Sequence, residues 1–452
     1  MKCDKCGRVA TIHITEIRRG IAYDRHLCES CAETFLPIEE SNTSEFLDLL
    51  PPKGSEHPTA EGEPTRDEMD MTGVRQRVFV ADLATGERFA AGPRVADSWH
   101  PAWSPDSKRL AMCHGTEDLP SLAVVEPGTP EAWHFIDTTF SEPPTWSHDS
   151  RRIAFSHEDA GLHVVAADLD AGELLRVSEE ADAHDFLPAW SPRDDRLAFV
   201  SVTADAPGEP PMECAVNVAR PGTDERRRVI AGDSMLVGVG WSADAQWLAA
   251  AATEGAEEEA GPEGPAYVVR CARADGSVEP FVIPRLLTGT WVPRAANFSD
   301  APAILAMIAA GTGARTVLID PASRRRRTLA DDLSFPAGLV RPSHLSPDGR
   351  LLAALRGVGT IRIAILDLVT GNISELDPRG EVAWFGWLPD GSGLAALVRD
   401  SSGVRLEVLS PTGDRRTVTL FARADFFDAP SASISPDGKR VAIEVHVTAD
   451  KG

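Results

Sequence analysis

The sequence predicts an all-β protein, an eight-bladed β-propeller that follows a small β module with four cysteines. Three observations lead to this prediction. A motif centred on an aromatic or aliphatic residue recurs at eight places, every 42 to 57 residues. Each copy of the motif has the composition of a β-hairpin. Four of the seven cysteines fall within the first 31 residues, in two C-x2-C pairs.

The repeat is clearest in its first four copies. These are PAWSPDSKRLAMC at Trp103, PTWSHDSRRIAFS at Trp146, PAWSPRDDRLAFV at Trp190 and VGWSADAQWLAAA at Trp241. Weaker copies are centred on Phe298, Leu345, Trp387 and Ile434. A period of about 40 to 50 residues is typical of propeller blades.

Each motif suits a hairpin for physical reasons. Its Ser can hydrogen-bond its own turn, Pro fixes the next φ, and Asp and Gly complete the turn. The flanking residues alternate as strands do, which places the aromatic residue between neighbouring sheets. A second hairpin follows each motif, as in residues 162–178 and 361–377. Two hairpins form one four-stranded blade.

The two ends of the repeat complement each other. Residues 77–90 form a second-type hairpin without a motif, and the last motif, 434–447, has no second hairpin after it. We therefore expect residues 77–90 to pair with 441–447, giving eight blades and no open sheet edge. Seven blades is the alternative, if the motif at Phe298 forms no sheet of its own.

The paired cysteines, Cys3, Cys6, Cys28 and Cys31, predict one structural zinc ion. Two residues between thiolates let one tight turn present both sulfurs, and two such turns complete a tetrahedron. Residues 9–17 and 21–27 between the pairs have the pattern of two antiparallel strands, so the module is zinc-ribbon-like. Two disulfides are the alternative, and four thiolates leave no open position for a catalytic zinc.

The chain thus divides into a zinc-binding module (1–36), an acidic flexible linker (37–73) and the propeller (74–452). The linker holds ten acidic and two basic residues, too polar to form a core. Its SEFLDLL stretch either docks as a short amphipathic turn or is ordinary linker. The isolated Cys113, Cys214 and Cys271 are expected to be buried free thiols.

Charge and hydropathy exclude several classes of function. The formal net charge of −24 argues against general nucleic-acid binding and against an anionic membrane surface. No stretch of about 18 apolar residues is present, and the first ten residues lack the apolar core of a signal peptide. The expected location is the cytoplasm.

The first 35 residues resemble a known module. MKCDKCGRVATIHITEI followed by HLCESCAE is similar to the N-terminal zinc module of McsA-type activators of bacterial protein arginine kinase. The resemblance implies zinc ligation by the four cysteines. The further cysteine pairs and the helical UVR motif of those activators are missing, so regulation of a kinase or protease rests on this resemblance alone.

The repeats resemble a second family. Trp-Ser-Pro-Asp at 103–106 and Ser-Pro-Asp-Gly at 346–349 and 435–438 are similar to the PD40, or TolB-like, subtype of WD40-related bacterial propellers. This resemblance implies a propeller that serves as a binding platform, and it says little about activity.

No catalytic motif accompanies the propeller. The sequence lacks a G-x-S-x-G elbow, an H-E-x-x-H helix, a phosphate-binding loop and a dinucleotide fingerprint. We therefore expect no enzymatic activity, and a scaffold for a protein or peptide partner of unknown identity. The alternative is a hydrolase or lyase at the channel mouth, with a metal held by His100, His184 or His344.

Ligands of the propeller are expected at the channel mouth, where the loops that enter each motif converge. Those loops carry polar and aromatic residues: Asp97, Trp99, His100, Glu142, His184, Asp185, Phe186, Trp291, Arg294, Arg341, His344, Asp425, Phe426 and Phe427. The alternative is that they cap blades and hold channel water. The runs Arg226–Arg228 and Arg324–Arg327 are interpreted as solvated edge charges, and residues 253–264 as a disordered insertion.

Overall fold

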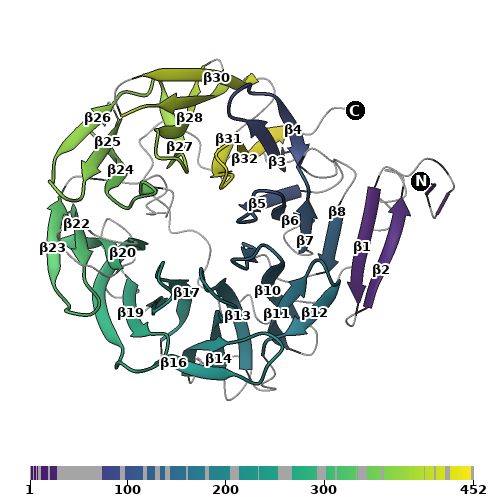
Figure 1. The fold of residues 1–452 in the computed structure, drawn as a ribbon. Coiled ribbons are helices and arrows are strands. Elements are labelled where there is room, and N and C mark those ends of the chain that lie inside the picture. The colour runs from purple at the N-terminus through teal and green to yellow at the C-terminus, as the bar shows by residue number, and fades with distance from the viewer. Residues whose placement is uncertain are drawn as a thin grey trace.

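The computed structural model of the protein is a ring of β-sheets around a central axis (Figure 1). It describes residues 2–3, 5–6, 8, 12–18, 21–27, 74–91, 97–115, 120–127, 133–137, 143–158, 161–178, 183–203, 213–232, 234–252, 267–292, 302–310, 313–331, 333, 344–357, 361–401, 403–411, 414–422 and 428–448. The predicted all-β class and the eight-blade arrangement are confirmed. Within these residues, no helix is long and apolar enough to span a membrane.

The first three blades are regular four-stranded antiparallel sheets whose strands follow one another in chain order from the axis to the rim (Figure 1). Blade one is β5 (Asp97–Trp103), β6 (Leu110–Gly115), β7 (Pro120–Val125) and β8 (Trp133–Asp137). Blade two is β9 (Thr145–Trp146), β10 (Arg152–Glu158), β11 (Leu162–Asp168) and β12 (Glu173–Arg176). Blade three is β13 (Ala183–Trp190), β14 (Leu197–Thr203), β15 (Glu213–Ala219) and β16 (Arg226–Gly232).

Blades four and five are joined by one long strand, β20 (Phe281–Val292). Blade four is β17 (Leu236–Trp241), β18 (Trp247–Ala252), β19 (Tyr267–Arg273) and the first half of β20. Blade five is the second half of β20 with β21 (Ala303–Ala310), β22 (Gly313–Ile319) and β23 (Arg326–Ala330). Leu286 pairs with both neighbours, with Tyr267 of blade four and Ile308 of blade five.

Blades six and seven continue the ring. Blade six is β24 (Leu351–Arg356), β25 (Arg362–Asp367) and β26 (Ile373–Leu376), with a bridge from Leu345 to Leu352 on its inner side. Blade seven is β27 (Glu381–Trp387), β28 (Leu394–Asp400), β29 (Gly403–Leu409) and β30 (Arg415–Ala422).

Blade eight closes the ring as the sequence predicts. It combines β31 (Asp428–Ile434) and β32 (Arg440–Thr448) with β3 (Val74–Asp82) and β4 (Arg88–Ala91). The register of β3 and β32 runs from Val74 opposite Thr448 to Asp82 opposite Arg440. The predicted pairing of residues 77–90 with 441–447 is therefore confirmed, and a strand from each end of the propeller completes one sheet.

Five tryptophan anchors of the ring each tie their blade to the one before it. Trp103, Trp146, Trp241, Trp291 and Trp387 each donate their indole Nε1–H to a backbone carbonyl of the preceding blade, at 2.8 to 3.2 Å. The acceptor is in every case the residue just before the preceding anchor: Ser433, Ala102, Ala189, Gly240 and His344. Since Trp291 pairs with Ile304 as Trp241 pairs with Leu248, Trp291 is the anchor of blade five. Phe298, which the sequence suggested, lies outside the described residues.

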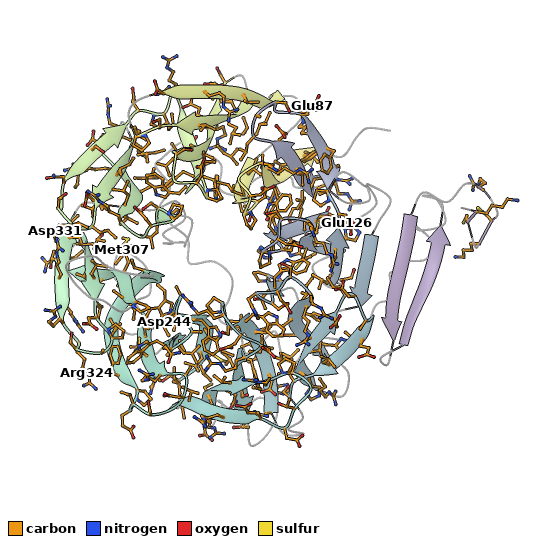
Figure 2. All side chains as sticks on the ribbon, viewed as in Figure 1. Glu87, Glu126, Asp244, Met307, Arg324 and Asp331 are labelled. Carbon is orange, nitrogen blue, oxygen red and sulfur yellow. The ribbon has the colours of Figure 1, made fainter. Side chains whose placement is uncertain are left out.

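The Ser-x-Asp turns form as expected. In blade one, Ser104 Oγ donates to Asp106 Oδ1 at 2.6 Å and accepts Arg109 N–H at 2.9 Å. The same pair of bonds recurs at Ser147, Ser242, Ser346 and Ser435. Asp244, in such a turn, lies closer to the axis than Arg324, which lies at the rim (Figure 2).

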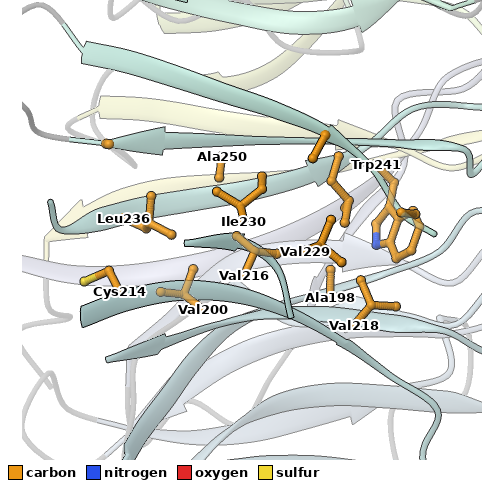
Figure 3. Packing of buried hydrophobic residues seen from close by; sticks show 14 of the residues in the cluster. Ala198, Val200, Cys214, Val216, Val218, Val229, Ile230, Leu236, Trp241 and Ala250 are labelled. Carbon is orange, nitrogen blue, oxygen red and sulfur yellow. The ribbon is translucent and has the colours of Figure 1, made fainter. Parts of the chain in front are cut away.

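The core consists of the layers between adjacent blades. Successive strand residues face opposite neighbours, so both faces of a blade are buried and the strands are nearly continuous apolar runs. Between blades three and four, Val200, Val216 and Ile230 pack with Leu236 and Ala250 (Figure 3). Burying one such aliphatic side chain contributes about 1.5–3 kcal/mol.

Arginines reinforce these layers at the turns. Arg193 Nε donates to Ala243 O in the next blade at 2.7 Å, and Arg440 Nη1 donates to Pro127 O at 3.0 Å across the ring closure. In the run 324–327, the guanidinium of Arg327 reaches Val369 O at 3.2 Å, and that of Arg324 lies 5.6 Å from the centroid of Phe281. At least these two residues of the run connect blades.

The N-terminal hairpin lies outside the ring. Its strands, β1 (Ile12–Arg18) and β2 (Ile21–Leu27), are antiparallel with Arg18 opposite Ile21, and β1 lies beside β8 of blade one (Figure 1). Cys3 is buried and Cys6 is exposed. Cys28 and Cys31, the linker 37–73 and residues 253–264 lie outside the described residues.

Candidate functional site

A group of polar side chains gathers where blades eight and one meet, on β3 and β32 of blade eight and on β5, the innermost strand of blade one. Asp97 begins β5, and its Oδ1 accepts the backbone N–H of Gln76 from β3 at 3.2 Å. The Arg75 guanidinium lies 3.8 Å from the same oxygen. The side-chain amide nitrogen of Gln76 lies 3.1 Å from Nε2 of His446 on β32. Gln76, on the first strand of the propeller, thus contacts both blade one and the C-terminal strand β32.

His100 lies three residues after Asp97, at an irregularity of β5. The register of β5 with β6 shifts between Trp99 and Ala102, and His100 has a left-handed φ of 53°. Such bulges redirect side chains and are frequent at functional rims. The His100 side chain is exposed, and its backbone N–H donates to Glu444 Oε2 at 3.1 Å. We call Gln76, Asp97, His100, Glu444 and His446 the closure site.

The closure site rests on a buried polar layer. Ser98 and His114 are both 1% exposed, and Ser98 Oγ lies 3.0 Å from His114 Nδ1. Burial lowers the pKa of His114 to about 4, with the Arg77 charge acting in the same direction. His114 is therefore uncharged at neutral pH, and it supports the β5 backbone without adding a positive charge.

Burial shifts the pKa of Asp97 in the opposite direction to that of His114. Burial raises the pKa of its carboxyl above the ordinary value, although the Arg75 charge and the Gln76 N–H both favour the ionised form. Its side chain keeps 29% of its surface exposed. A carboxyl that is partly accessible and holds its proton more firmly than usual is suited to acid–base chemistry.

Blade three holds a second polar network, built around a buried carboxylate. Asp185 is fully buried and accepts a hydrogen bond from Ser201 Oγ. Ser201 Oγ in turn accepts from Asn217 Nδ2 at 2.7 Å and from the Arg226 guanidinium at 3.3 Å. Since all four groups are tied within blade three, this network stabilises the sheet.

The structure separates the residues that the sequence grouped at the mouth. Trp99 and Phe186 are buried, and His184 is half-buried on β13. His344 is 2% exposed and stacks on Phe385, with 4.7 Å between the ring centroids. The indole N–H of Trp291 donates to Gly240 O, between blades five and four. The remaining candidates lie outside the described residues: Glu142, Arg294, Arg341, Asp425, Phe426 and Phe427.

Asp97 and His100 are the two candidates that the structure brings together with other polar groups. Arg75, Gln76, Glu444 and His446 were missed, because they belong to the two terminal strands and to no motif. The predicted pairing of residues 77–90 with 441–447 was the nearest signal, since in the structure the same pairing continues to Gln76 opposite His446.

The metal set suggested for the alternative function is not assembled. His100, His184 and His344 belong to three different blades, and His344 is buried against Phe385. Among the described residues, no three His, Cys, Asp or Glu side chains are grouped so that they could hold a metal ion. The zinc prediction for the N-terminal cysteines is not tested by this, since Cys28 and Cys31 are outside the described residues.

Two surface pockets among the described residues lie away from the closure site. One, of about 780 Å³, is lined at the blade-eight turn by Asp82, Arg88, Phe89 and Arg440 among others. The other, of about 340 Å³, lies between the turns of blades three and four and includes Arg196, Arg226 and Asp275. Their lining arginines already have protein partners, so we place the candidate chemistry at the closure site.

No family model matches the chain, and no curated protein matches it in sequence. Solved structures do share its architecture. A putative TolB from Agrobacterium tumefaciens is 14% identical with a TM-score of 0.39, covering 82% of this chain and 98% of that one. An oligogalacturonate lyase in complex with manganese is 14% identical with a TM-score of 0.44, covering 82% and 97%.

A puromycin-hydrolyzing peptidase of Mycobacterium tuberculosis is also similar. It is 14% identical with a TM-score of 0.47, and the match covers 77% of this chain and 58% of that one. At such identities the likeness concerns the fold alone.

The expectation that this protein is not an enzyme, which rested on the lack of catalytic motifs, was wrong. Two of these three similar structures are enzymes, a lyase and a peptidase. The lack of the sequence motifs considered above does not exclude activity.

Proposed function

We propose that the closure site binds a small polar substrate and performs acid–base chemistry on it, as a hydrolase or a lyase. One observation carries this proposal: an exposed imidazole, His100, and a partly exposed carboxyl with a raised pKa, Asp97, lie three residues apart on one inner strand. Both are held by groups of blade eight, through Glu444 and Gln76.

The two groups have complementary chemistry. An imidazole exchanges protons near neutral pH, and a carboxyl with a raised pKa can donate one. In either reaction class, His100 takes a proton from the substrate or from an attacking water. Asp97 delivers a proton to the leaving group. Arg75, beside Asp97, can attract an anionic substrate group to the same place.

The proposal is tested by assaying the full chain on substrates of both classes. An oligogalacturonate reports lyase activity, and an aminoacyl amide such as puromycin reports hydrolase activity. We expect turnover of one of them and a fall in kcat/KM of about 100-fold or more in Asp97→Asn and in His100→Gln.

His157→Gln is the matched control, because His157 is a half-buried histidine of β10, outside the closure site. It should retain wild-type kcat/KM. No turnover with either class, or turnover that survives both closure-site substitutions, would contradict the proposal.

Binding of a protein or peptide partner on the axial side of the ring is a second candidate function. Val237 lies at the bulge of β17, where the register shifts between Leu236 and Gly238, and it is 37% exposed. An exposed aliphatic side chain on an inner strand suits the apolar side chain of a peptide. Affinity purification with the full chain should recover a partner that Val237→Glu loses, whereas Val282→Glu, at the exposed rim position on β20, should retain it.

We further propose one structural zinc ion on Cys3, Cys6, Cys28 and Cys31. The Cys3 N–H donates to Arg8 O at 2.7 Å, which folds the first pair into a tight turn of the kind that presents two thiolates. Native mass spectrometry of the full chain should find one zinc, and the Cys3→Ser, Cys6→Ser double variant should lose it. A cytoplasmic location and regulation of a kinase or protease through this module stay predictions.

A further inference from the structure

We infer that Glu444 is a positioning residue for His100, fixing its backbone and supplying a negative charge next to its backbone N–H, from which it acts on the imidazole. This inference rests on the proposed function of the closure site, and it assigns a role to a residue of the C-terminal strand. His100 has a φ of 53°, which is uncommon for a residue with a side chain.

The contacts of Glu444 are directed at this conformation. Its side chain is buried, with the residue only 7% exposed, and Oε2 accepts both the His100 N–H at 3.1 Å and the Ser431 hydroxyl at 3.0 Å. Ser431 lies opposite Glu444 in the β31–β32 register. One carboxylate oxygen therefore joins the C-terminal sheet to the bulge of blade one.

A comparison within the ring shows that the bulge alone does not need a carboxylate. In blade three, Leu187 precedes Pro188 and has the same φ of 53°, as His100 precedes Pro101. Glu444 is the third residue after Val441, which pairs with the anchor Ile434. The residue at that position in the blade before Leu187 is Ser156, the third after Ile153.

A buried carboxylate thus replaces a serine at the junction where the bulge residue is a histidine. Removing a carboxylate from water costs free energy unless it is hydrogen-bonded. We therefore look for an effect of Glu444 that a serine hydroxyl cannot supply, and this effect is its negative charge. A negative charge close to an imidazole favours the protonated ring, and this effect is specific to histidine. At the leucine of blade three a charge would serve no such purpose.

Other charged and titratable groups lie at the junction of blades eight and one, and they must be held constant in a test. Asp97 comes from the same strand, Arg75 and Arg77 from β3, His114 from β6, and His446 from β32. Substitution of Glu444 alone changes one charge and leaves these five residues in place.

The test compares Glu444→Gln, Glu444→Ala and Glu444→Asp in the full chain with histidine labelled for NMR, the His100 signals being assigned with His100→Gln. The glutamine keeps an acceptor for the His100 N–H but no charge. We expect it to move the imidazole titration midpoint of His100 about half a pH unit lower while the backbone amide signal stays in place. Alanine should shift both signals, and aspartate should restore the midpoint.

Ser431→Ala is the control, since it removes the other bond to Oε2 and keeps the charge. It should leave the His100 midpoint unchanged. An unchanged midpoint in Glu444→Gln, with a wild-type urea unfolding curve, would overturn the inference. These titrations use no substrate, so their result does not depend on whether the proposed activity exists. Turnover unaffected by His100→Gln would refute the proposed function and leave the positioning role intact.

Discussion

Gln76 and His446, 370 residues apart in the chain, meet side chain to side chain at 3.1 Å across the closure of the ring. The same Gln76 gives its backbone N–H to Asp97. Ring closure and the candidate chemistry therefore share a residue. A change that loosens the terminal strands must also disturb the site.

The first prediction concerns this contact. Gln76→Ala and His446→Ala should each destabilise the protein, and the double variant should show a coupling of about 0.5–1.5 kcal/mol. The coupling is obtained from the urea unfolding curves of all four proteins in a double-mutant cycle. Asn372→Ala, at an exposed turn of blade six, is the amide control and should change the free energy of unfolding by less than about 0.5 kcal/mol. Additive effects of the two closure substitutions would show that the contact contributes nothing.

The second prediction compares two anchors of the same type. Trp241 Nε1 donates to Ala189 O at 2.8 Å, whereas the buried Nε1 of Trp190 has no acceptor among the described residues. Trp241→Phe leaves a partly buried carbonyl without its donor and should cost about 1–3 kcal/mol beyond the lost ring volume. Trp190→Phe removes a similar ring volume and no such bond, so it should cost less. Equal losses in chemical denaturation would contradict the view that the indole bonds hold the blades together.

The third prediction concerns acid. Hydrogen bonds, foremost from Thr85 N–H, lower the pKa of Asp82, and a bond from Ser392 N–H lowers that of Asp390. The Ser277 hydroxyl has the same effect on the pKa of Asp275. Carboxyls with pKa values lower in the folded than in the unfolded chain add stability above the unfolded value, and this stability is lost as the pH falls through the folded value.

The urea midpoint should therefore be steady near neutral pH and fall below about pH 4. Asp82→Asn retains an acceptor oxygen and cannot titrate, so its midpoint should fall less steeply with acid. A midpoint that is independent of pH down to about 3 would refute this account.

The fourth prediction concerns the thiols. Cys113, Cys214 and Cys271 are buried, as expected from the sequence, and burial raises the pKa values of Cys214 and Cys271. A thiol reacts as its thiolate, so these two should resist alkylation in the folded protein. Cys6 is exposed and should react first when zinc is absent. Peptide mapping after brief iodoacetamide treatment measures both rates, and fast labelling of Cys271 in folded protein would contradict its burial.

The fold could be predicted largely from the sequence because the turns and anchors repeat. Ser104, Pro105 and Asp106 have local reasons to form a turn, and the spacing of the copies sets the number of blades. Blade five was the weak point, since its anchor, Trp291, lies within a long strand and lacks the Ser-Pro-Asp turn. The motif search therefore selected Phe298, seven residues further on.

The candidate site was harder to predict. Asp97 and His100 stood next to a motif, but Glu444 and His446 lie on an ordinary strand, and only the packing of blade eight on blade one brings them to β5. Which face of β32 meets blade one depends on the packing of whole sheets, which the register of two strands does not determine. His344 was misplaced for the same reason: it precedes a motif, and yet it stacks on Phe385.

The long strand β20 joins blades four and five without a loop between them. Its residues hydrogen-bond to β19 along the first half and to β21 along the second, so no loop between these two blades can act as a hinge. Breathing motions of the ring should be confined to the remaining boundaries. Blades four and five should exchange their amide hydrogens as one cooperative unit, the slowest to open in the molecule.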